Sequence, residues 1–167
     1  WEGPAWRASD QNAQSSAQLG FQSENVTLMS WRPLGEFGNQ SSGNDCWGYV
    51  SPSGREYALM GLRSGTGFVE ITEPDNAQIV DVISAPNSLW HDIKVYEDYC
   101  YVVSEAGSGI QVIDMSNIDN GEVELVAEIN GSGTASTHNV AIDTTSGFLY
   151  RSGGGSNGLR VYSLANP

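Results

Sequence analysis

The sequence predicts an all-β protein built from repeated antiparallel strands. After residue 24, short runs of β-branched, aromatic and other apolar residues alternate with turns rich in Gly, Pro, Asn and Asp, and the 167-residue chain carries 20 glycines. Similar strand-like segments recur every 42 to 49 residues. A period of this length that holds four short strands is typical of one blade of a β-propeller, in which four-stranded antiparallel sheets surround a central axis.

Three aligned sets of segments define the repeat. Each unit contains, in the same order, a first strand, a second strand and a third strand that follows a glycine. The three kinds of segment start at Cys46, His91 and His138, at Glu56, Tyr99 and Phe148, and at Gly67, Gly109 and Gly158. The first set has spacings of 45 and 47 residues, and the glycines have spacings of 42 and 49. Because three independent anchors keep one order at nearly one period, chance is a weak explanation.

The repeat divides the chain into five parts. Residues 1–24 are rich in Ser, Gln and Ala without a period, which predicts a low-complexity tail or linker. Residues 25–37 begin with a β-prone run that predicts an orphan strand, of the kind that closes the last blade of a propeller. Two complete blades are expected at residues 46–84 and 91–131, and a partial blade at residues 138–167.

Within these units the expected strands follow the apolar alternation. They are residues 46–51, 56–62, 67–72 and 78–83 of the first blade, residues 91–97, 99–105, 109–115 and 123–129 of the second, and residues 158–163 as the third strand of the third. With the orphan strand, the count amounts to about three blades, fewer than the four or more that usually surround an axis. We therefore expect part of a larger ring; the alternative is a ring that copies of the chain complete together.

Composition narrows the possible partners. The chain has 20 Asp and Glu against 7 Lys and Arg, a formal net charge of −13, and its single lysine is Lys94. Such a charge repels nucleic acid backbones and anionic lipid surfaces, so we expect no nucleic acid partner. No apolar run approaches the length of about 20 residues that spans a bilayer, so we expect no membrane insertion.

The cysteines and the possible glycosylation sites leave the cellular compartment open. Cys46 and Cys100 can pair in an oxidising compartment, or each can serve as a small buried apolar residue. Three Asn-x-Ser/Thr tripeptides, at Asn25, Asn39 and Asn130, match the glycosylation pattern, which is frequent by chance.

The two histidines are the candidate metal ligands. His91 and His138 occupy equivalent places at the start of first strands, and Cys46 takes that place in the first unit. If first strands line the axis, these side chains converge there, and imidazole and thiolate are ligands for a transition metal. We favour the alternative that they close hydrogen bonds at the mouth of the channel.

Acidic and amide side chains lie beside the proposed metal ligands. Successive side chains of a strand point to opposite faces, so Asp92 is not expected to share a ligand with His91. We expect the carboxylates among them, Asp45 and Asp92, to accept backbone N–H bonds in the loops between blades, and Asn139 directly follows His138 as Asp92 follows His91. Calcium remains an alternative divalent metal in so acidic a chain, although the sequence has no D-x-D-x-D-G loop.

Other motifs give weak signals for catalysis or binding. Ser104 and Glu105 suggest a hydrolase only by composition, because no G-x-S-x-G elbow is present, and catalysis is the less favoured hypothesis. The glycine-rich run at residues 153–158 lacks the Lys-Ser/Thr of a phosphate-binding loop, which favours a tight turn. For Trp31, Trp47 and Trp90, packing between neighbouring sheets is favoured over a sugar- or peptide-binding surface.

The repeat resembles a known family. Its third strand, read as GIQVID at residues 109–114, is similar to the LVIVD repeat. Further segments resemble the choice-of-anchor B family, namely residues 43–48 (GNDCWG), 55–61 (REYALMG), 92–96 (DIKVY), 103–106 (VSEA), 111–114 (QVID) and 138–140 (HNV). The resemblance covers about residues 25–167. It implies a longer, secreted or surface-exposed bacterial protein with a propeller-like repeat domain and a variable carboxy-terminal anchor.

Two functions follow as hypotheses. The first is a secreted or cell-surface β-propeller that binds proteins or glycans without catalysis and that associates into homo-oligomers or fibres through exposed strand edges. The second is a metal-binding propeller, an enzyme or a carrier, with its centre at His91, His138 and Cys46. The fold alone does not choose between them.

Overall fold

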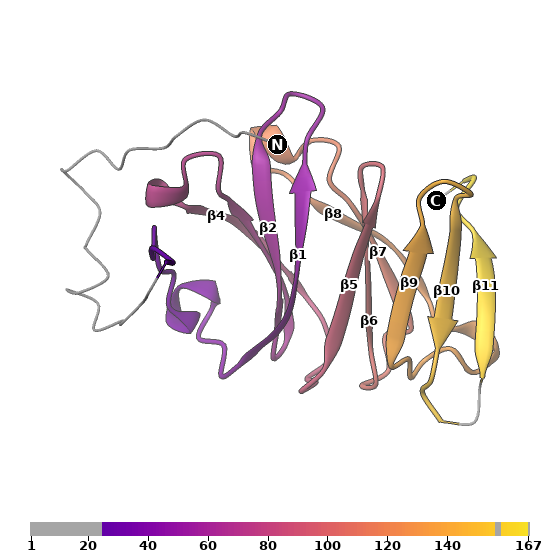
Figure 1. Cartoon of the computed structure of the whole chain (residues 1–167). Coiled ribbons are helices and arrows are strands. Elements are labelled where there is room, and N and C mark those ends of the chain that lie inside the picture. The colour runs from indigo at the N-terminus through magenta and orange to yellow at the C-terminus, as the bar shows by residue number, and fades with distance from the viewer. Residues whose placement is uncertain (1–24, 156–157, 167) are drawn as a thin grey trace.

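A computed structural model describes residues 25–155 and 158–166 of the chain (Figure 1). The predicted tail at residues 1–24 lies outside the described residues. Within the described ranges the regular structure is β-strand, joined by 3-10 turns at Leu34–Phe37 (η1), Pro74–Asn76 (η2), Ile118–Asn120 (η3) and Gly131–Gly133 (η4). No α-helix is present in this part of the chain, and the predicted all-β class is confirmed.

The strands form three antiparallel sheets, named A, B and C in chain order. Sheet A consists of β1 (Gly43–Val50), β2 (Glu56–Leu62), β3 (Gly65–Glu70) and β4 (Gln78–Ser84). Sheet B consists of β5 (His91–Tyr96), β6 (Tyr99–Ser104), β7 (Ile110–Asp114) and β8 (Glu124–Ile129). Sheet C consists of β9 (Asn139–Asp143), β10 (Phe148–Ser152) and β11 (Leu159–Ser163). In each sheet the strands follow one another in chain order, and the strand positions agree closely with those predicted.

The prediction of a strand within residues 25–37 is wrong. Residues 26–33 belong to none of the three sheets, and Leu34–Phe37 form η1. The physical reason is that β-propensity alone does not make a strand, because the backbone also needs a neighbouring strand for its hydrogen bonds. Phe37 nevertheless anchors the segment, since its ring is buried against Leu62 and Val69 of sheet A.

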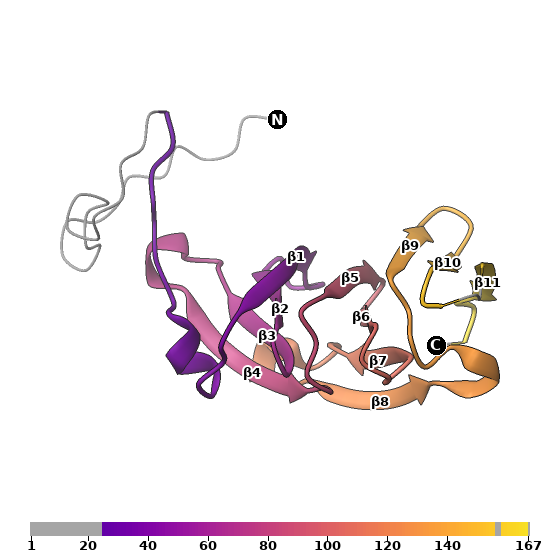
Figure 2. The ribbon, with the colours of Figure 1, turned by 90° about the horizontal axis from the view of Figure 1, so that it is seen from below.

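The sheets stand in a row, with sheet B between A and C (Figures 1 and 2). Their first strands β1, β5 and β9 are neighbours, as the contacts of β5 with β1 and with β9 show. Successive side chains of β6 point to opposite faces of sheet B. Val102 packs with Leu59 of sheet A, and Val103 packs with Leu149 of sheet C. Each gap between sheets therefore contains its own apolar core.

The strand ladders correct the predicted alignment of the repeat at Cys46. Ile93, opposite Val102, lies in the core that sheet B shares with sheet A. Cys46 lies opposite Met60, which packs on the other side of sheet A, against the cluster around Phe37. Cys46 therefore corresponds to Ile93, and first strands repeat every 47 residues. The alignment of Cys46 with His91 is therefore wrong by two residues, and a β-bulge between Gly43 and Cys46 interrupts the ladder just before it.

The glycine alignment needs a similar correction. Gly65 ends the ladder of β2 with β3, and Gly109 immediately precedes β7. A Cβ on Gly65 would lie 2.4 Å from the carbonyl oxygen of Ile83, and one on Gly109 would lie 2.1 Å from that of Ile129. Gly65, rather than Gly67, thus corresponds to Gly109. Both glycines let the fourth strand of a sheet end directly over the third.

This close approach makes Gly65 sensitive to substitution. We expect Gly65→Ala to lower the free energy of unfolding by about 1–3 kcal/mol, because backbone atoms must move to admit the methyl group. Gly48→Ala is the matched control, since a Cβ on Gly48 meets no atom within 4 Å and this glycine also lies in sheet A. Urea unfolding of both variants measures the difference; equal stability would contradict the proposed contact.

Candidate functional site

The first strands carry a repeated hydrogen bond between sheets. The Asp45 Oδ2 atom in sheet A accepts a bond of 2.8 Å from the backbone N–H of Ile93 in sheet B. The Asp92 Oδ2 atom in sheet B accepts one of 2.7 Å from the N–H of Val140 in sheet C. Each bond links residues 48 positions apart. The expectation that Asp45 and Asp92 accept backbone N–H bonds is confirmed, but the donors lie in strands β5 and β9 and not in loops.

Asn139 occupies the third equivalent position but bonds in the opposite direction. Its amide Nδ2 donates a bond of 3.2 Å back to Asp92 Oδ2.

Lys94 ties the first of these junctions to the second. Its ammonium group lies 4.5 Å from the centre of the Trp47 ring in sheet A and donates a hydrogen bond to Asp92 Oδ1. Burial favours the neutral form of Asp92, but the bonds from Lys94 and from the Val140 N–H outweigh it, so the pKa of Asp92 lies below its ordinary value. Asp92 is thus an ionised acceptor, buried between sheets B and C.

The three predicted metal ligands do not share one centre in this structure. His91 is buried and accepts a bond of 3.3 Å at Nδ1 from the Asn44 amide, whereas His138 is exposed and donates from Nδ1 to Glu105 at 2.9 Å. Cys46 is exposed and corresponds to Ile93, two residues beyond the place of the histidines. Across the described residues, no group of three His, Cys, Asp or Glu side chains is placed to hold a metal ion.

His91 lies between sheets A and B without a full set of partners. Burial lowers its pKa, which favours the neutral ring. Since Nδ1 accepts from Asn44, the remaining proton lies on Nε2, which has no hydrogen-bond partner among the described residues. Both histidine rings thus make a hydrogen bond, while the expected channel mouth around them stays a prediction.

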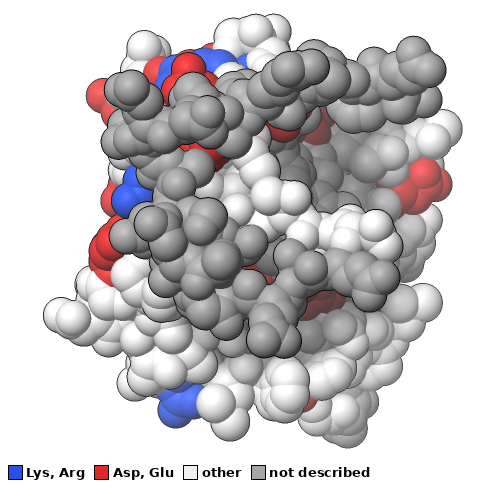
Figure 3. Space-filling view, turned by 60° about the vertical axis from the view of Figure 1, so that its left-hand side comes forward, with Lys and Arg blue, Asp and Glu red and all other residues white. Residues whose placement is uncertain are grey.

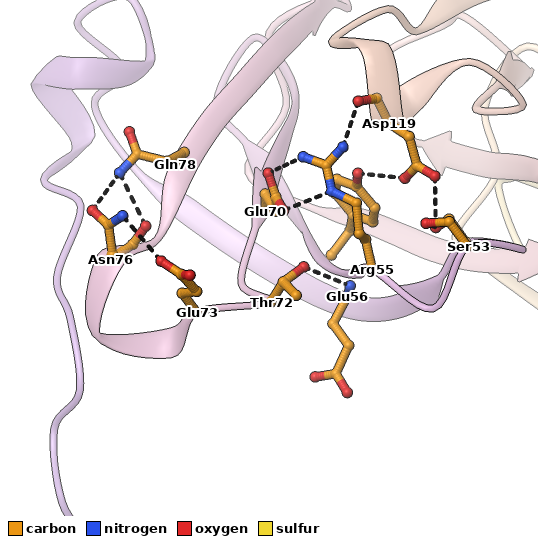
Figure 4. A network of polar contacts seen from close by, with 11 residues as sticks. Ser53, Arg55, Glu56, Glu70, Thr72, Glu73, Asn76, Gln78 and Asp119 are labelled. Atoms are coloured by element: carbon orange, nitrogen blue, oxygen red, sulfur yellow. Dashed lines mark hydrogen bonds and ion pairs between the residues drawn. The ribbon is translucent and has the colours of Figure 1, made fainter. Parts of the chain in front are cut away.

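A second polar network joins sheets A and B at their other end (Figure 4). Arg55 pairs with Glu70 through Nε at 2.8 Å and donates a further bond to the Asp119 carbonyl in η3 of sheet B. The Asp119 carboxylate accepts bonds from the Tyr57 hydroxyl at 2.7 Å and from Ser51 at 3.1 Å. Burial first, and then the bond to Asp119, raise the pKa of Tyr57 and keep it a donor.

The sequence reasoning missed this network. The Ser-Pro-Ser-Gly run at residues 51–54 signals a turn, but nothing in the sequence relates Asp119 to a strand of another unit. A bond of 2.7 Å between the hydroxyl of Tyr49 and Asp98 adds to the same junction. Sheets A and B are therefore joined by polar contacts at both ends and by an apolar core in between.

The junction of sheets B and C contains a buried cation. Arg151 in β10 is fully buried, donates from Nε to Thr137 Oγ1 at 2.8 Å and also donates to the Ser136 carbonyl. Desolvation lowers its pKa. The ladder places Arg151 opposite Val140, where sheet B has Val102 opposite Ile93. In sheet C the guanidinium group of Arg151 therefore holds the segment before β9, at a position where sheet B has the aliphatic side chain of Val102.

The remaining candidate residues lie at the surface or serve the core. Asn25, Asn39 and Asn130 are all exposed, and glycosylation at them stays a prediction. Cys100 is a buried free thiol whose pKa burial raises, and Cys46 is also free.

The prediction that the tryptophans fill gaps between sheets is wrong. Trp31, Trp47 and Trp90 keep 56%, 42% and 61% of their surface exposed. Smaller side chains such as Leu59 and Phe68 fill the core between sheets A and B instead.

The surface agrees with the acidic composition. On the face in Figure 3, Asp and Glu are scattered among uncharged side chains, and Lys and Arg show at only a few places among the residues coloured or white. None of the helices in the described ranges has the length and apolar character needed to cross a membrane.

No family model matches the chain, and the searches of curated proteins and of solved structures likewise give no match.

The ionised state of Asp92 predicts a pH dependence. A carboxylate whose pKa is depressed in the folded state contributes stability above its unfolded pKa of about 3.9, and this stability is lost as the pH falls through the folded pKa. We expect Asp92→Asn, which keeps an acceptor but no charge, to be less stable than the parent at pH 7. In acid unfolding series the difference should shrink as the pH falls from about 3.9 through the lower folded pKa of Asp92. A difference independent of pH would contradict the assignment.

Asp119 provides a test of the second network. We expect Asp119→Ala to lower the free energy of unfolding by about 1–2 kcal/mol, because Tyr57 and Ser51 lose their acceptor. Asp75→Ala is the matched control, since Asp75 is the middle residue of η2, as Asp119 is of η3. Guanidinium denaturation of both variants gives the comparison, and equal losses would show that the contact across the sheets is immaterial.

Proposed function

We propose that the chain is part of a secreted or cell-surface β-propeller that acts as a non-catalytic interaction module. The observation that carries the proposal is the repeated bond of Asp45 to Ile93 and of Asp92 to Val140, at one constant separation. A constant link between successive sheets is what a radial arrangement requires, since each sheet must meet the next in the same way. The resemblance to the choice-of-anchor B family supports the same architecture and a surface location.

The polar residues of the first strands favour a structural role over a catalytic one. Asp45 and Asp92 hold backbone N–H groups of the next sheet, and Lys94 is committed to Asp92 and Trp47. Groups engaged in this way join sheets together. Function then rests on the connecting loops, which a rigid scaffold holds in place.

The loop between β4 and β5 is the best candidate for contact with a partner. It exposes two neighbouring large apolar side chains, Leu89 at 60% and Trp90 at 61%. The Ser88 hydroxyl fixes their backbone by accepting from the Trp90 N–H at 3.1 Å and donating to the Trp90 carbonyl at 2.7 Å. An aromatic ring on a fixed backbone gives contact area at low cost in conformational entropy, which suits the binding of a protein or a glycan.

This proposal predicts binding that depends on Trp90. The full chain, applied at micromolar concentration to a glycan array and to an array of purified cell-surface proteins, should bind a defined subset of either. Trp90→Ala should weaken that binding at least tenfold, in line with the loss of an aromatic anchor. Val50→Ala is the control, because Val50 is equally exposed at 61% but is the last residue of β1 and does not belong to the loop between β4 and β5. Absence of binding on both arrays would contradict the proposal.

A further inference from the structure

One end of sheet B carries an exposed aromatic ring and an exposed carboxylate. The ladder of β5 with β6 begins at the pair of His91 and Ser104. Trp90 directly precedes His91 and Glu105 directly follows Ser104, so both residues leave the same end of this ladder. Trp90 keeps 61% of its surface exposed, and the side chain of Glu105 keeps 46%. An apolar ring and a negative charge are therefore both open to solvent at one end of two paired strands.

His138 determines which hydrogen bonds this end of sheet B offers to a partner. Its Nδ1 atom donates to Glu105 Oε1 at 2.9 Å, and its side chain is itself 52% exposed. A neutral imidazole that donates from Nδ1 has an acceptor at Nε2, and an ionised carboxylate has only acceptors. The pair therefore presents Glu105 Oε2 and His138 Nε2 as acceptors, and a partner group that binds both has to donate.

A cation held by a tryptophan ring and a carboxylate already occurs within the chain. The Lys94 ammonium group lies 4.5 Å from the centre of the Trp47 ring and donates to Asp92. Trp90 and Glu105 supply the same two kinds of group, but here both are exposed. The chemistry that binds an internal cation at one junction can therefore bind the cation of a partner at the other.

Among cationic side chains, arginine fits this end of the sheet best. A guanidinium group is planar, stacks on aromatic rings, and carries five N–H donors and no acceptor. It can lie on the Trp90 ring while its donors bind Glu105 and His138. The net charge of −13 attracts such a group over a distance. The matching end of sheet A is different, because Arg63 follows β2 where Glu105 follows β6.

We propose that the partner of this module is a protein that presents an exposed arginine side chain, which stacks on Trp90 and donates hydrogen bonds to Glu105 and His138. The inference rests on the proposed function and deepens it, because it chooses a protein over a glycan and names the side chain that is recognised. Tryptophan and arginine are the residues that most often supply the binding energy of protein interfaces. The Ser88 hydroxyl holds the backbone of Trp90 and so prepares the ring for this contact.

An NMR titration of the full chain with the peptide acetyl-Gly-Gly-Arg-Gly-Gly-amide tests the contact. We expect shifts of the Trp90 indole N–H and of the Glu105 and His138 amides at millimolar peptide. The same peptide with citrulline keeps the shape of arginine without its charge. It should bind about tenfold more weakly, because it loses the ion pair and the cation–π contact together. Equal binding of the two peptides, shifts centred elsewhere, or no shifts would overturn the proposal.

A pair of variants separates a local contact from general attraction to an acidic chain. Glu105→Gln should weaken binding of the arginine peptide about fivefold, the upper range for an exposed ion pair. Glu97→Gln is the matched control, since Glu97 is also exposed and lies between β5 and β6 at the opposite end of the same strands. It removes the same charge and should leave binding unchanged. Equal weakening by both variants would overturn the proposal.

The partner found on the arrays distinguishes this inference from the proposed function. A protein partner whose binding is weakened by both Trp90→Ala and Glu105→Gln supports the arginine contact. A neutral glycan partner, or a protein partner that Trp90→Ala weakens and Glu105→Gln does not, would overturn the arginine contact and leave the interaction module standing.

Discussion

The structure depends on the hydrogen bonds by which each sheet satisfies N–H groups on the first strand of the next sheet. β5 and β9 are edge strands of sheets B and C, so some of their N–H groups point away from their own ladders. Ile93 and Val140 are buried, and a buried N–H without an acceptor costs about 1–3 kcal/mol. Asp45 and Asp92 supply the acceptors from the preceding sheet. One carboxylate per junction thereby removes an unpaired donor and sets the register of two sheets.

This arrangement leaves the rest of each junction free to vary. Sheets A and B add the Arg55–Asp119 network at their other end, while sheets B and C use the buried Arg151 beside Thr137. The apolar cores differ too, with Leu59 facing Val102 in one gap and Val103 facing Leu149 in the other. A repeat can therefore lose most of its sequence similarity and keep its geometry, provided that the acceptor and the first-strand spacing persist.

The features that could be predicted from the sequence are those that depend on neighbouring residues of the chain. Alternation and turn residues placed the strands of sheets A and B well, because both are local signals. The register of the first unit was misjudged by two residues at Cys46, because apolar alternation has a period of two and does not reveal such a shift. The orphan strand was wrong because pairing is not a local property. Asp45 and Asp92 were identified as acceptors, but Asp119 was not, because its partner Tyr57 lies in a different sheet.

The negative net charge of the chain opposes the association that exposed strand edges and apolar side chains would favour. A net charge of −13 on 167 residues disfavours unspecific contact between copies, which protects a surface that exposes strand edges and large apolar side chains such as Trp90. The protection is weakest where a contact involves few carboxylates. Residues 85–90, the loop that carries Trp90, contain none, so this exposed apolar side chain lies where repulsion between like-charged molecules is smallest.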